Sequence, residues 1–530
     1  MKLNKITKTA TICMSLLAAV GCTDNFEDIN TNNNGITPEL FQQDFNHIKG
    51  GFAPMFNNIQ TITSQLEWQY QLQQGLNSDI WSGYMATPTP FGGSNNTTYN
   101  LNDNWNGFIW SIAYSNVMFN AYNIEQLSKG KYDQFYALAL ILKVEGMHRI
   151  TDTFGPIIYS KYGTTDPTIE YDSQQEVYNK MFAELDIAVT ELTKRVDSGD
   201  DGTTSFGKTD LSGYGGKFEQ WIKFANTLRL RLAMRVVKVD PALAKIQAEK
   251  AVAQKFGVMK TNADLFQIQS PVNTNPIATI SGSWLDIRMG ADMESILGGY
   301  NDPRIATYFD TSAQFPGEYK GVRTGIEITA KGDHQDFSGI GAVVRSKNIV
   351  LMTTAEAYFL RAEGALRGWN MDGDAKSLYE LGITSSFDQR GASGAANYIT
   401  DNVKTAKAYV DPNFPVNNSA PVNNVTIAWD AAATNEVKLQ KIITQKWIAG
   451  FPEGQEAWSD YRRTGYPKLF PVLKNTSGGK ITTEFGVRRV NFVQSEISLN
   501  KGGVDSGIAK LNGPDTGGTR LWWDTTAGNF

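Results

Sequence analysis

Cysteine and histidine are both scarce in this chain. The 530 residues include two cysteines, Cys13 and Cys22, both close to the N-terminus. The chain beyond Cys22 therefore has no thiol, which excludes disulfide bonds, thiolate zinc sites and cysteine nucleophiles from it. The three histidines, His47, His148 and His334, are not spaced as a metal-binding pair. A histidine-based metal centre or catalytic triad is not predicted, and no cofactor is expected.

The chain also lacks an excess of basic residues and any long apolar segment. Lysine plus arginine number 49 against 54 for aspartate plus glutamate, which gives a formal net charge of −5. No basic cluster is interleaved with aromatic residues, so nucleic acid is not an expected partner. The apolar run over residues 11–20 is too short to cross a bilayer as a helix.

The N-terminal segment has the pattern of an export signal. Lysines precede the apolar run, and small or β-branched residues at 19–21 stand directly before Cys22. Such residues before a cysteine resemble the bacterial lipobox, in which the cysteine is lipidated. We predict a lipoprotein signal peptide over residues 1–21, lipidation of Cys22, and a flexible polar tether over residues 22–36. The alternative is an ordinary signal peptide cut at the same place without lipidation.

The clearest periodic stretch runs from Ile349 to Gly368. Its apolar residues recur at helical spacing along one stripe. The stripe consists of Leu351, Ala355, Tyr358, Ala362, Ala365 and Trp369. Half of these residues are alanine, and small side chains let a neighbouring helix approach closely. A polar turn at 370–374 is followed by a second helical pattern from Ala375, so we predict a helical hairpin of the tetratricopeptide type.

Helical patterns recur along most of the chain, whereas strand-like alternation is scarce and short. Ser173 and Glu176 form a capping box before one such pattern, and Asp240 precedes another. The predicted fold is therefore mainly α: a tetratricopeptide-like scaffold of helix pairs with long irregular loops and little β structure. We expect a single domain over residues 37–530. The long loops cover residues 87–104, 270–347 and 391–425, and loops of this length are usually functional or disordered.

One segment matches the pattern of a phosphate-binding loop, at residues 202–209. A true loop of this kind follows a buried strand and opens a helix. This segment instead follows a helix end and the acidic run at 197–201, so phosphate binding is not predicted there. Paired carboxylates for glycoside hydrolysis stay open as an alternative, because their separation in space is not visible in a sequence.

Aromatic residues set among amide and hydroxyl side chains stand out in the loops and near their ends. Sugar rings present apolar C–H faces that stack on such aromatics, while polar neighbours bind the hydroxyl groups. The candidate ligand-binding residues are Trp81, Tyr84, Trp105, Trp284 and Tyr300. We predict that the two long loops near Trp105 and Trp284 converge on one face. The alternative is that these aromatics only anchor the loops to the helices.

Several segments resemble the SusD/RagB family of nutrient-binding lipoproteins. The two longest cover residues 349–381 and 442–469. Shorter similar segments lie at residues 151–156, 224–235 and 520–524, besides the lipobox and its acidic tether. The resemblance extends over the whole mature chain, and the segments together are specific although each alone is weak.

This resemblance implies a location on the outer membrane, with a lipid anchor and the protein facing the cell exterior. It also implies a SusC-like, TonB-dependent barrel as the partner, over which the lipoprotein acts as a lid that captures oligosaccharides, or peptides, for import. No catalysis is expected. The two alternatives are a lipid-anchored glycoside hydrolase and a tetratricopeptide-type adaptor that binds another protein, although an adaptor has no need of the aromatic loops.

Overall fold

The computed structural model describes residues 42–346 and 348–530. The predicted export signal, the tether and the predicted lipidation residue Cys22 lie outside the described residues. The chain divides into two units, Met1–His47 and Ile48–Phe530. The described part of the first unit contains the short helix η1 (Gln43–Phe45) and the start of α4 (Asn46–Lys49).

The second unit is mainly helical, as predicted. Its α-helices are α5 (Phe52–Ile59), α6 (Glu67–Tyr70), α7 (Ser78–Trp81), α8 (Asp103–Ile112), α9 (Phe119–Ser128), α10 (Asp133–Phe154), α11 (Gln174–Asp197), α12 (Thr203–Phe206), α13 (Phe218–Val236), α14 (Pro241–Ala253), α15 (Ala291–Tyr300), α16 (Ile305–Tyr308), α17 (Thr354–Leu366), α18 (Ala375–Arg390), α19 (Ala395–Ile399), α20 (Asn435–Gly450), α21 (Gly454–Thr464), α22 (Gln494–Leu499) and α23 (Lys501–Ala509). The π-helical turns are η2 (Gln71–Gly75), η4 (Ala113–Met118) and η5 (Ala278–Ser283), and the 3₁₀ turns are η3 (Asn96–Thr98), η6 (Lys331–Asp333) and η7 (Pro415–Asn417). The strands are β1 (Met85–Ala86), β2 (Phe266–Ile268), β3 (Arg288–Met289) and β4 (Ile349–Met352).

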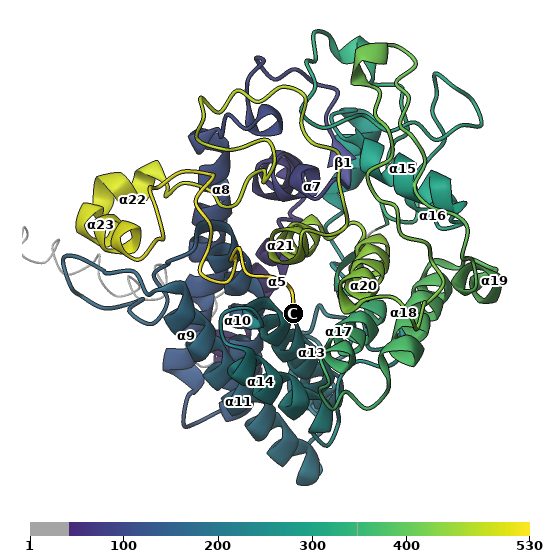
Figure 1. Cartoon of the computed structure of the whole chain (residues 1–530). Helices are drawn as coiled ribbons and strands as arrows, with labels where there is room; N and C mark the ends of the chain where they lie inside the picture. The colour runs from purple at the N-terminus through teal and green to yellow at the C-terminus, as the bar shows by residue number, and fades with distance from the viewer. Residues whose placement is uncertain (1–41, 347) are drawn as a thin grey trace, which may run out of the picture. The chain divides into compact units, whose positions relative to one another are not determined.

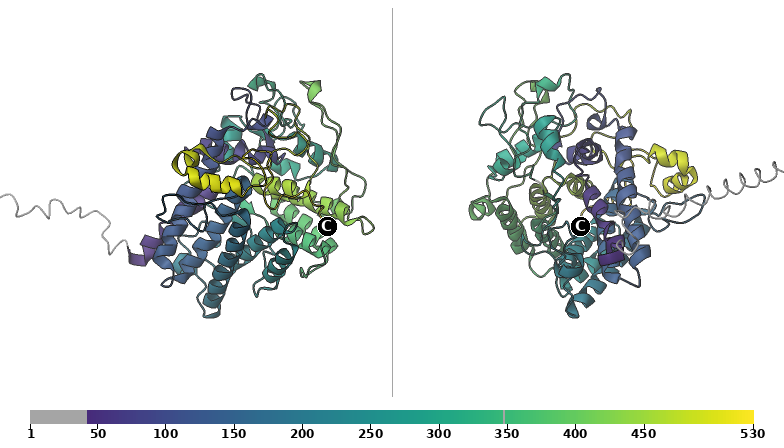
Figure 2. Two further views of the ribbon diagram at one scale, coloured as in Figure 1. Left: turned by 60° about the vertical axis from the view of Figure 1, so that its left-hand side comes forward. Right: turned by 180° about the vertical axis from the view of Figure 1, so that it is seen from behind.

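Neighbouring helices of this unit pack against one another in pairs. α10 packs on α11, α11 on α13, α13 on α14, and α17 on both α18 and α20 (Figure 1). Figure 2 shows the blue and teal helices of the first half of the chain lying side by side. α14 begins at Pro241, soon after α13 ends at Val236, and a short connection of this kind favours a helical hairpin. The helix-pair scaffold predicted from the sequence is therefore confirmed.

Two of these helices, α11 and α14, begin at the capping residues that the sequence predicts. The Ser173 hydroxyl accepts a hydrogen bond from the Glu176 backbone N–H, and the Glu176 carboxylate accepts one from the Ser173 backbone N–H. The Asp240 carboxylate caps α14 by accepting from the Leu243 backbone N–H at 3.0 Å. Each cap satisfies a backbone donor that the first helical turn leaves free.

The predicted helix over Ile349–Gly368 is wrong in its first turn. Residues 349–352 form β4, which pairs antiparallel with β2, and α17 begins only at Thr354. Thr353 is the N-cap, and its hydroxyl accepts from the Glu356 backbone N–H at 3.1 Å. A short apolar run is compatible with either a strand or a helix, and here the pairing partner decides. Leu351 therefore leaves the helical stripe, while Ala355 and Ala362 stay on it, fully buried.

A second short ladder joins the first two long loops. β1, which leads into the loop over residues 87–104, pairs antiparallel with β3, which lies within the loop over residues 270–347. The predicted convergence of these two loops is therefore confirmed. Within the described residues, no helix is both long enough and apolar enough to cross a membrane.

Candidate functional site

The two long loops meet at the carboxylate of Asp286. This side chain accepts hydrogen bonds from Thr89 Oγ1 at 2.6 Å and from Gln71 Nε2 at 3.1 Å. Lys331 Nζ lies 2.6 Å from the same carboxylate and also donates to the Trp284 carbonyl oxygen at 2.5 Å. Asp286 is thus an anchor that fixes one loop against the other and sets the position of Trp284.

Trp284 follows η5 and is half-buried against the main apolar core. Gly282 and Ser283 just before it are exposed, and Leu285 just after it has a backbone φ of 57°. A bulky residue in this left-handed region is strained, and strained backbone is often found at functional sites. Phe91 in the other loop has a similar φ of 43°.

Further aromatic rings lie close to these loops in two edge-on pairs. Trp105 on α8 packs against Phe91 with ring centroids 5.5 Å apart. One turn along α8, Phe108 packs against Trp68 of α6 at 5.2 Å. The side chain of Trp68 is 40% exposed, and α6 packs against η5, the turn that carries Trp284. We call the set Trp68, Phe91, Trp105, Phe108 and Trp284 the aromatic platform.

Three of the predicted binding residues are buried in this structure. Trp81 is 8% exposed, packs on Trp458 at 4.8 Å, and its indole N–H donates to the Asn96 carbonyl oxygen. Tyr84 is fully buried and donates its hydroxyl proton to a backbone carbonyl of α20. Tyr300 is 1% exposed and donates to the Val425 carbonyl oxygen at 2.8 Å. Trp105 and Trp284 are the two predicted residues that present part of their rings at the surface.

Trp68, Phe91 and Phe108 belong to the platform but are not among the five predicted binding residues. The pattern behind the prediction is aromatic residues in the loops and near their ends, whereas Trp68 lies on α6 and Phe108 on α8. The sequence does place Trp68 and Phe108 near the loop over residues 87–104, and this proximity could have indicated that they contribute to the same surface.

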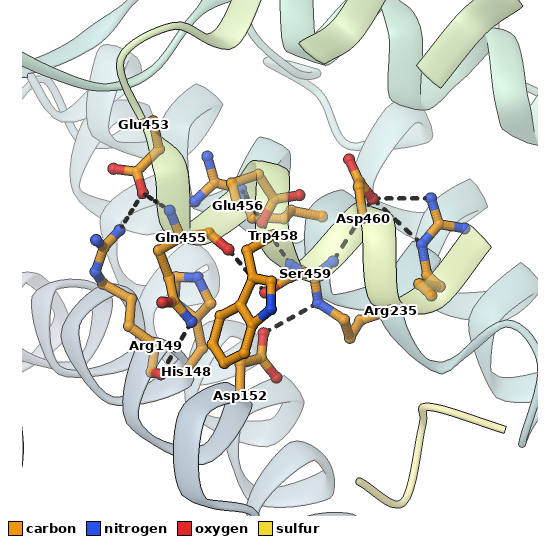
Figure 3. Close-up of polar contacts among 12 residues, drawn as sticks. His148, Arg149, Asp152, Arg235, Glu453, Gln455, Glu456, Trp458, Ser459 and Asp460 are labelled. Carbon is orange, nitrogen blue, oxygen red and sulfur yellow. Dashed lines mark hydrogen bonds and ion pairs between the residues drawn. The ribbon is translucent and has the colours of Figure 1, made fainter. Parts of the chain in front are cut away.

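A second candidate is a cluster of buried polar side chains between α10, α13 and α21 (Figure 3). Arg235 bonds to Asp152 at 3.0 Å and to Glu456, and Arg149 lies 2.9 Å from Glu453. Figure 3 shows these groups facing one another across the helix interface. Acidic and basic side chains here neutralise each other, as buried charges must.

The pKa shifts of this cluster fit a structural role. Burial works to raise the pKa of Glu456, but Arg235 and Lys446 outweigh it and hold that pKa well below its usual range. Burial lowers the pKa of His148, which makes it neutral, and its Nδ1 lies 3.1 Å from the Val144 carbonyl oxygen. Glu456 therefore stays ionised and paired, and His148 is held in a local backbone contact.

The cavity beside this cluster has a volume of about 20 Å³ and is lined by Glu453, Glu456 and Asp460 among others. That volume holds about one water molecule, far less than a sugar ring needs. Residues 42–346 and 348–530 contain no group of three or more histidine, cysteine or acidic side chains placed to hold a metal ion. The aromatic platform is therefore the stronger candidate for ligand binding.

Comparison with protein families gives one match over nearly the whole chain. The model of the SusD-like family, described as SusD and RagB outer membrane lipoproteins, matches residues 28–524. A comparison with curated proteins finds no match.

Solved structures of SusD homologues resemble this chain closely. A chitin-binding SusD homologue from Flavobacterium johnsoniae is 78% identical, with a TM-score of 0.90 over 91% of this chain and 100% of its own. A SusD homologue from Bacteroides vulgatus is 38% identical, with a TM-score of 0.87 over 92% and 99% of the two chains. A SusD-like protein from Bacteroides thetaiotaomicron is 34% identical, with a TM-score of 0.85 over 91% and 100%.

Proposed function

The chain belongs to the SusD/RagB family of outer membrane lipoproteins, and on that basis we propose that it captures chitin or chitin oligosaccharides at the cell surface. The observation that carries the proposed ligand is the 78% identity to a chitin-binding homologue over that protein's whole length. The sequence predicts either an oligosaccharide or a peptide as the ligand. Of these two classes, we propose the oligosaccharide.

The aromatic platform supplies the chemistry that this ligand requires. Chitin is a polymer of N-acetylglucosamine, whose rings carry apolar C–H faces and whose substituents are uncharged hydroxyl and acetamide groups. Exposed indole rings stack on such faces, and neighbouring polar groups bind the substituents. Near Trp284 these groups include the exposed Ser283 and the guanidinium of Arg345, which lies beside Gly282.

Binding of a soluble chitin oligosaccharide to platform variants tests the proposal. Trp284→Ala and Trp105→Ala should each weaken binding by about 2 kcal/mol or more, because truncating a stacking aromatic removes a binding hot spot. The matched control is Trp369→Ala, because Trp369 is also half-buried against the same apolar core but lies in the connection that follows α17. Wild-type affinity in both platform variants, or an equal loss in the control, would contradict the platform as the binding site.

We propose that the protein binds the glycan without cleaving it. The buried carboxylates Glu456 and Asp460 are paired with arginine and lysine and border only a very small cavity, so they offer no room for a sugar. Chromatography of the oligosaccharide after long incubation checks this. If shortened products also form with a fresh preparation of the purified protein, the glycoside hydrolase alternative would be favoured.

Two further parts of the proposal concern attachment and transport. Lipidated Cys22 anchors the protein, and Cys22→Ala should move it from the membrane to the soluble fraction, because a protein without acyl chains loses its hydrophobic anchor.

A SusC-like, TonB-dependent barrel is the proposed partner, with this protein as its lid. Affinity purification of the tagged wild-type protein from outer membranes should recover such a barrel; repeated recovery of the protein alone would count against the lid role.

A further inference from the structure

A large cavity lies beside the C-terminal segment. It is lined by Lys238 just after α13, by Glu436 of α20, by α21 with residues 465–469 after it, and by residues 484–488 and 520–529. Its volume is about 670 Å³, within the range of small-molecule sites. None of its lining residues belongs to the aromatic platform. The role proposed above leaves this cavity unexplained.

The walls of the cavity are strongly cationic although the chain as a whole is acidic. Six of the lining residues are lysine or arginine and two are glutamate. The cations are Lys238, Arg462, Arg463, Lys468, Arg488 and Arg520. In a chain of net charge −5, such a local excess attracts anions.

Three of these cations have no carboxylate partner among the described residues. Arg462 is buried and donates to the Asp152 and Arg488 carbonyl oxygens at 2.6 and 2.8 Å, and the Arg462 guanidinium stacks over a tryptophan of the same helix. Arg462 also donates to the Ser459 hydroxyl at 2.9 Å, and Lys238 donates to two carbonyl oxygens. Lys468 is exposed and lies over the ring of Tyr466. Carbonyl oxygens satisfy hydrogen bonds but leave the net positive charge uncompensated.

A further two cations share a single carboxylate. Arg488 binds Asp524 with two of its nitrogens, and Arg520 Nη1 also lies 2.8 Å from Asp524. The pair therefore adds another uncompensated positive charge to the wall.

The wall also holds an unsatisfied acceptor. The Asn529 amide nitrogen donates to Glu436 and to the Thr464 carbonyl oxygen, but the Asn529 Oδ1 atom is buried without a hydrogen-bond partner. A buried amide oxygen without a donor is costly, and an anion offers no proton to satisfy it. The hydroxyl groups of a ligand can donate a hydrogen bond to this oxygen.

We propose that this cavity binds a small hydroxylated anion, a sugar that carries a carboxylate or a sulfate group. The oxyanion lies among Lys238, Arg462 and Lys468, and hydroxyl groups of the same molecule donate to acceptors such as Asn529. The cavity is then a second binding site, separate from the platform and selective for charged saccharides instead of neutral ones.

Calorimetric titration of the mature chain with glucose 6-sulfate, glucuronate, glucose and inorganic sulfate tests this proposal. Glucose 6-sulfate and glucuronate should bind, glucose should show no binding at the same concentrations, and sulfate should bind about tenfold more weakly because it lacks hydroxyl donors. Equal affinity for sulfate and the sugar sulfate, or binding of glucose as tight as that of glucuronate, would overturn the proposal.

Variants assign the binding to the cavity. Lys468→Gln and Lys238→Gln should each weaken glucose 6-sulfate binding by about tenfold, the loss expected for one charge-assisted contact. Lys438→Gln is the matched control, since Lys438 also donates to a backbone carbonyl but lies on α20 outside the cavity. Lys468 is exposed, so its variant should fold even if the Lys238 variant does not. Wild-type affinity in Lys468→Gln would contradict the assignment.

Chitin oligosaccharide binding should be unchanged in both variants, because neither lysine belongs to the aromatic platform. A failure of this proposal can therefore be distinguished from a failure of the proposed function.

The pH profile supplies an independent readout. Burial, and then Arg463, lower the pKa of Lys238 to about 8, while Asp524, Arg488 and Arg520 also act on it. A bound anion favours the charged amine, so affinity for glucose 6-sulfate, whose own charge is constant, should fall as pH rises through 8. Lys238→Gln should remove this step. A step that persists unchanged in Lys238→Gln would show that another group causes it and would exclude Lys238 from the site.

Discussion

The aromatic platform and the buried charges between α10, α13, α17 and α21 use opposite chemistry. On the platform, rings are partly exposed, carried by loops and short helices, and bordered by strained backbone at Phe91 and Leu285. Between the helices, arginines such as Arg231 and Arg235 are almost completely buried and contact several carboxylates each. The first arrangement leaves side chains free to meet a ligand, whereas the second already satisfies its own groups. Substitutions should therefore separate binding from stability.

The largest expected effect is in the buried network, at Arg231. Its guanidinium binds both oxygens of Glu356 at 2.8 Å and lies 3.6 Å from Glu145 and Glu456. Arg231→Ala removes the two-bond partner of the buried Glu356 carboxylate and leaves Lys446 at 3.4 Å as its nearest cation, and breaking a buried ion pair in this way typically costs about 3–5 kcal/mol. Urea denaturation followed by circular dichroism measures the loss.

The control for Arg231→Ala is Arg195→Ala, because Arg195 pairs with Glu191 on the partly exposed surface of α11. Surface pairs contribute about 0–1 kcal/mol. Comparable losses in the two variants would mean that burial of the network does not govern its contribution to stability.

Trp81→Ala tests whether a predicted binding residue belongs to the interior instead. Trp81 packs on Trp458 and donates to the Asn96 carbonyl oxygen, so its removal should lower the free energy of unfolding by about 3 kcal/mol. Chitin oligosaccharide affinity per folded molecule should stay at the wild-type value. A large loss of affinity with an unchanged denaturation midpoint would restore Trp81 to the binding site.

Ala362→Leu tests the close packing of α17. Ala362 is fully buried on the helix face that packs into the core, and α17 contacts α13, α18 and α20. Added methylene groups in a tightly packed interface typically cost about 1–3 kcal/mol. Thermal denaturation should show a clearly lower melting temperature, while Ala242→Leu, at an exposed position of α14, should leave it nearly unchanged. Equal melting temperatures in the two variants would show that the interface accommodates the larger side chain.

The helix scaffold was predictable because long helical patterns mark helices such as α10 and α13, and capping residues mark the starts of α11 and α14. The start of α17 was not predictable, because the apolar run at 349–352 fits a strand as well as a helix. Its partner strand, β2, is distant in sequence. A capping pattern at Thr353 and Glu356 was nevertheless present as a signal for the true helix start.

The binding surface was only partly predictable. Composition indicated the two loops and their convergence, but an aromatic residue in a loop has no periodicity that reveals which way it faces. Trp81, Tyr84 and Tyr300 are therefore indistinguishable in sequence from Trp284, although the structure buries them. The cationic cavity could not be predicted at all, because Lys238 and Lys468 are far apart in the sequence and only the folded chain brings them to one cavity.

The smallest expected effect is that of salt on glycan binding at the platform. Chitin is uncharged, and the charges nearest Trp284 are already paired: Lys331 with Asp286, and Arg345 with Asp310 at 2.8 Å. Raising the salt concentration from about 0.1 M to about 1 M shortens the screening length from about 10 Å to about 3 Å, which weakens attraction between unpaired charges but not ring stacking. Affinity for a chitin oligosaccharide should therefore change by less than about twofold over this range. Binding of glucose 6-sulfate in the cationic cavity should fall strongly over the same range, and this provides the internal control. A tenfold loss of chitin affinity in high salt would mean that charged groups dominate its recognition, and the platform would then not be the principal binding surface.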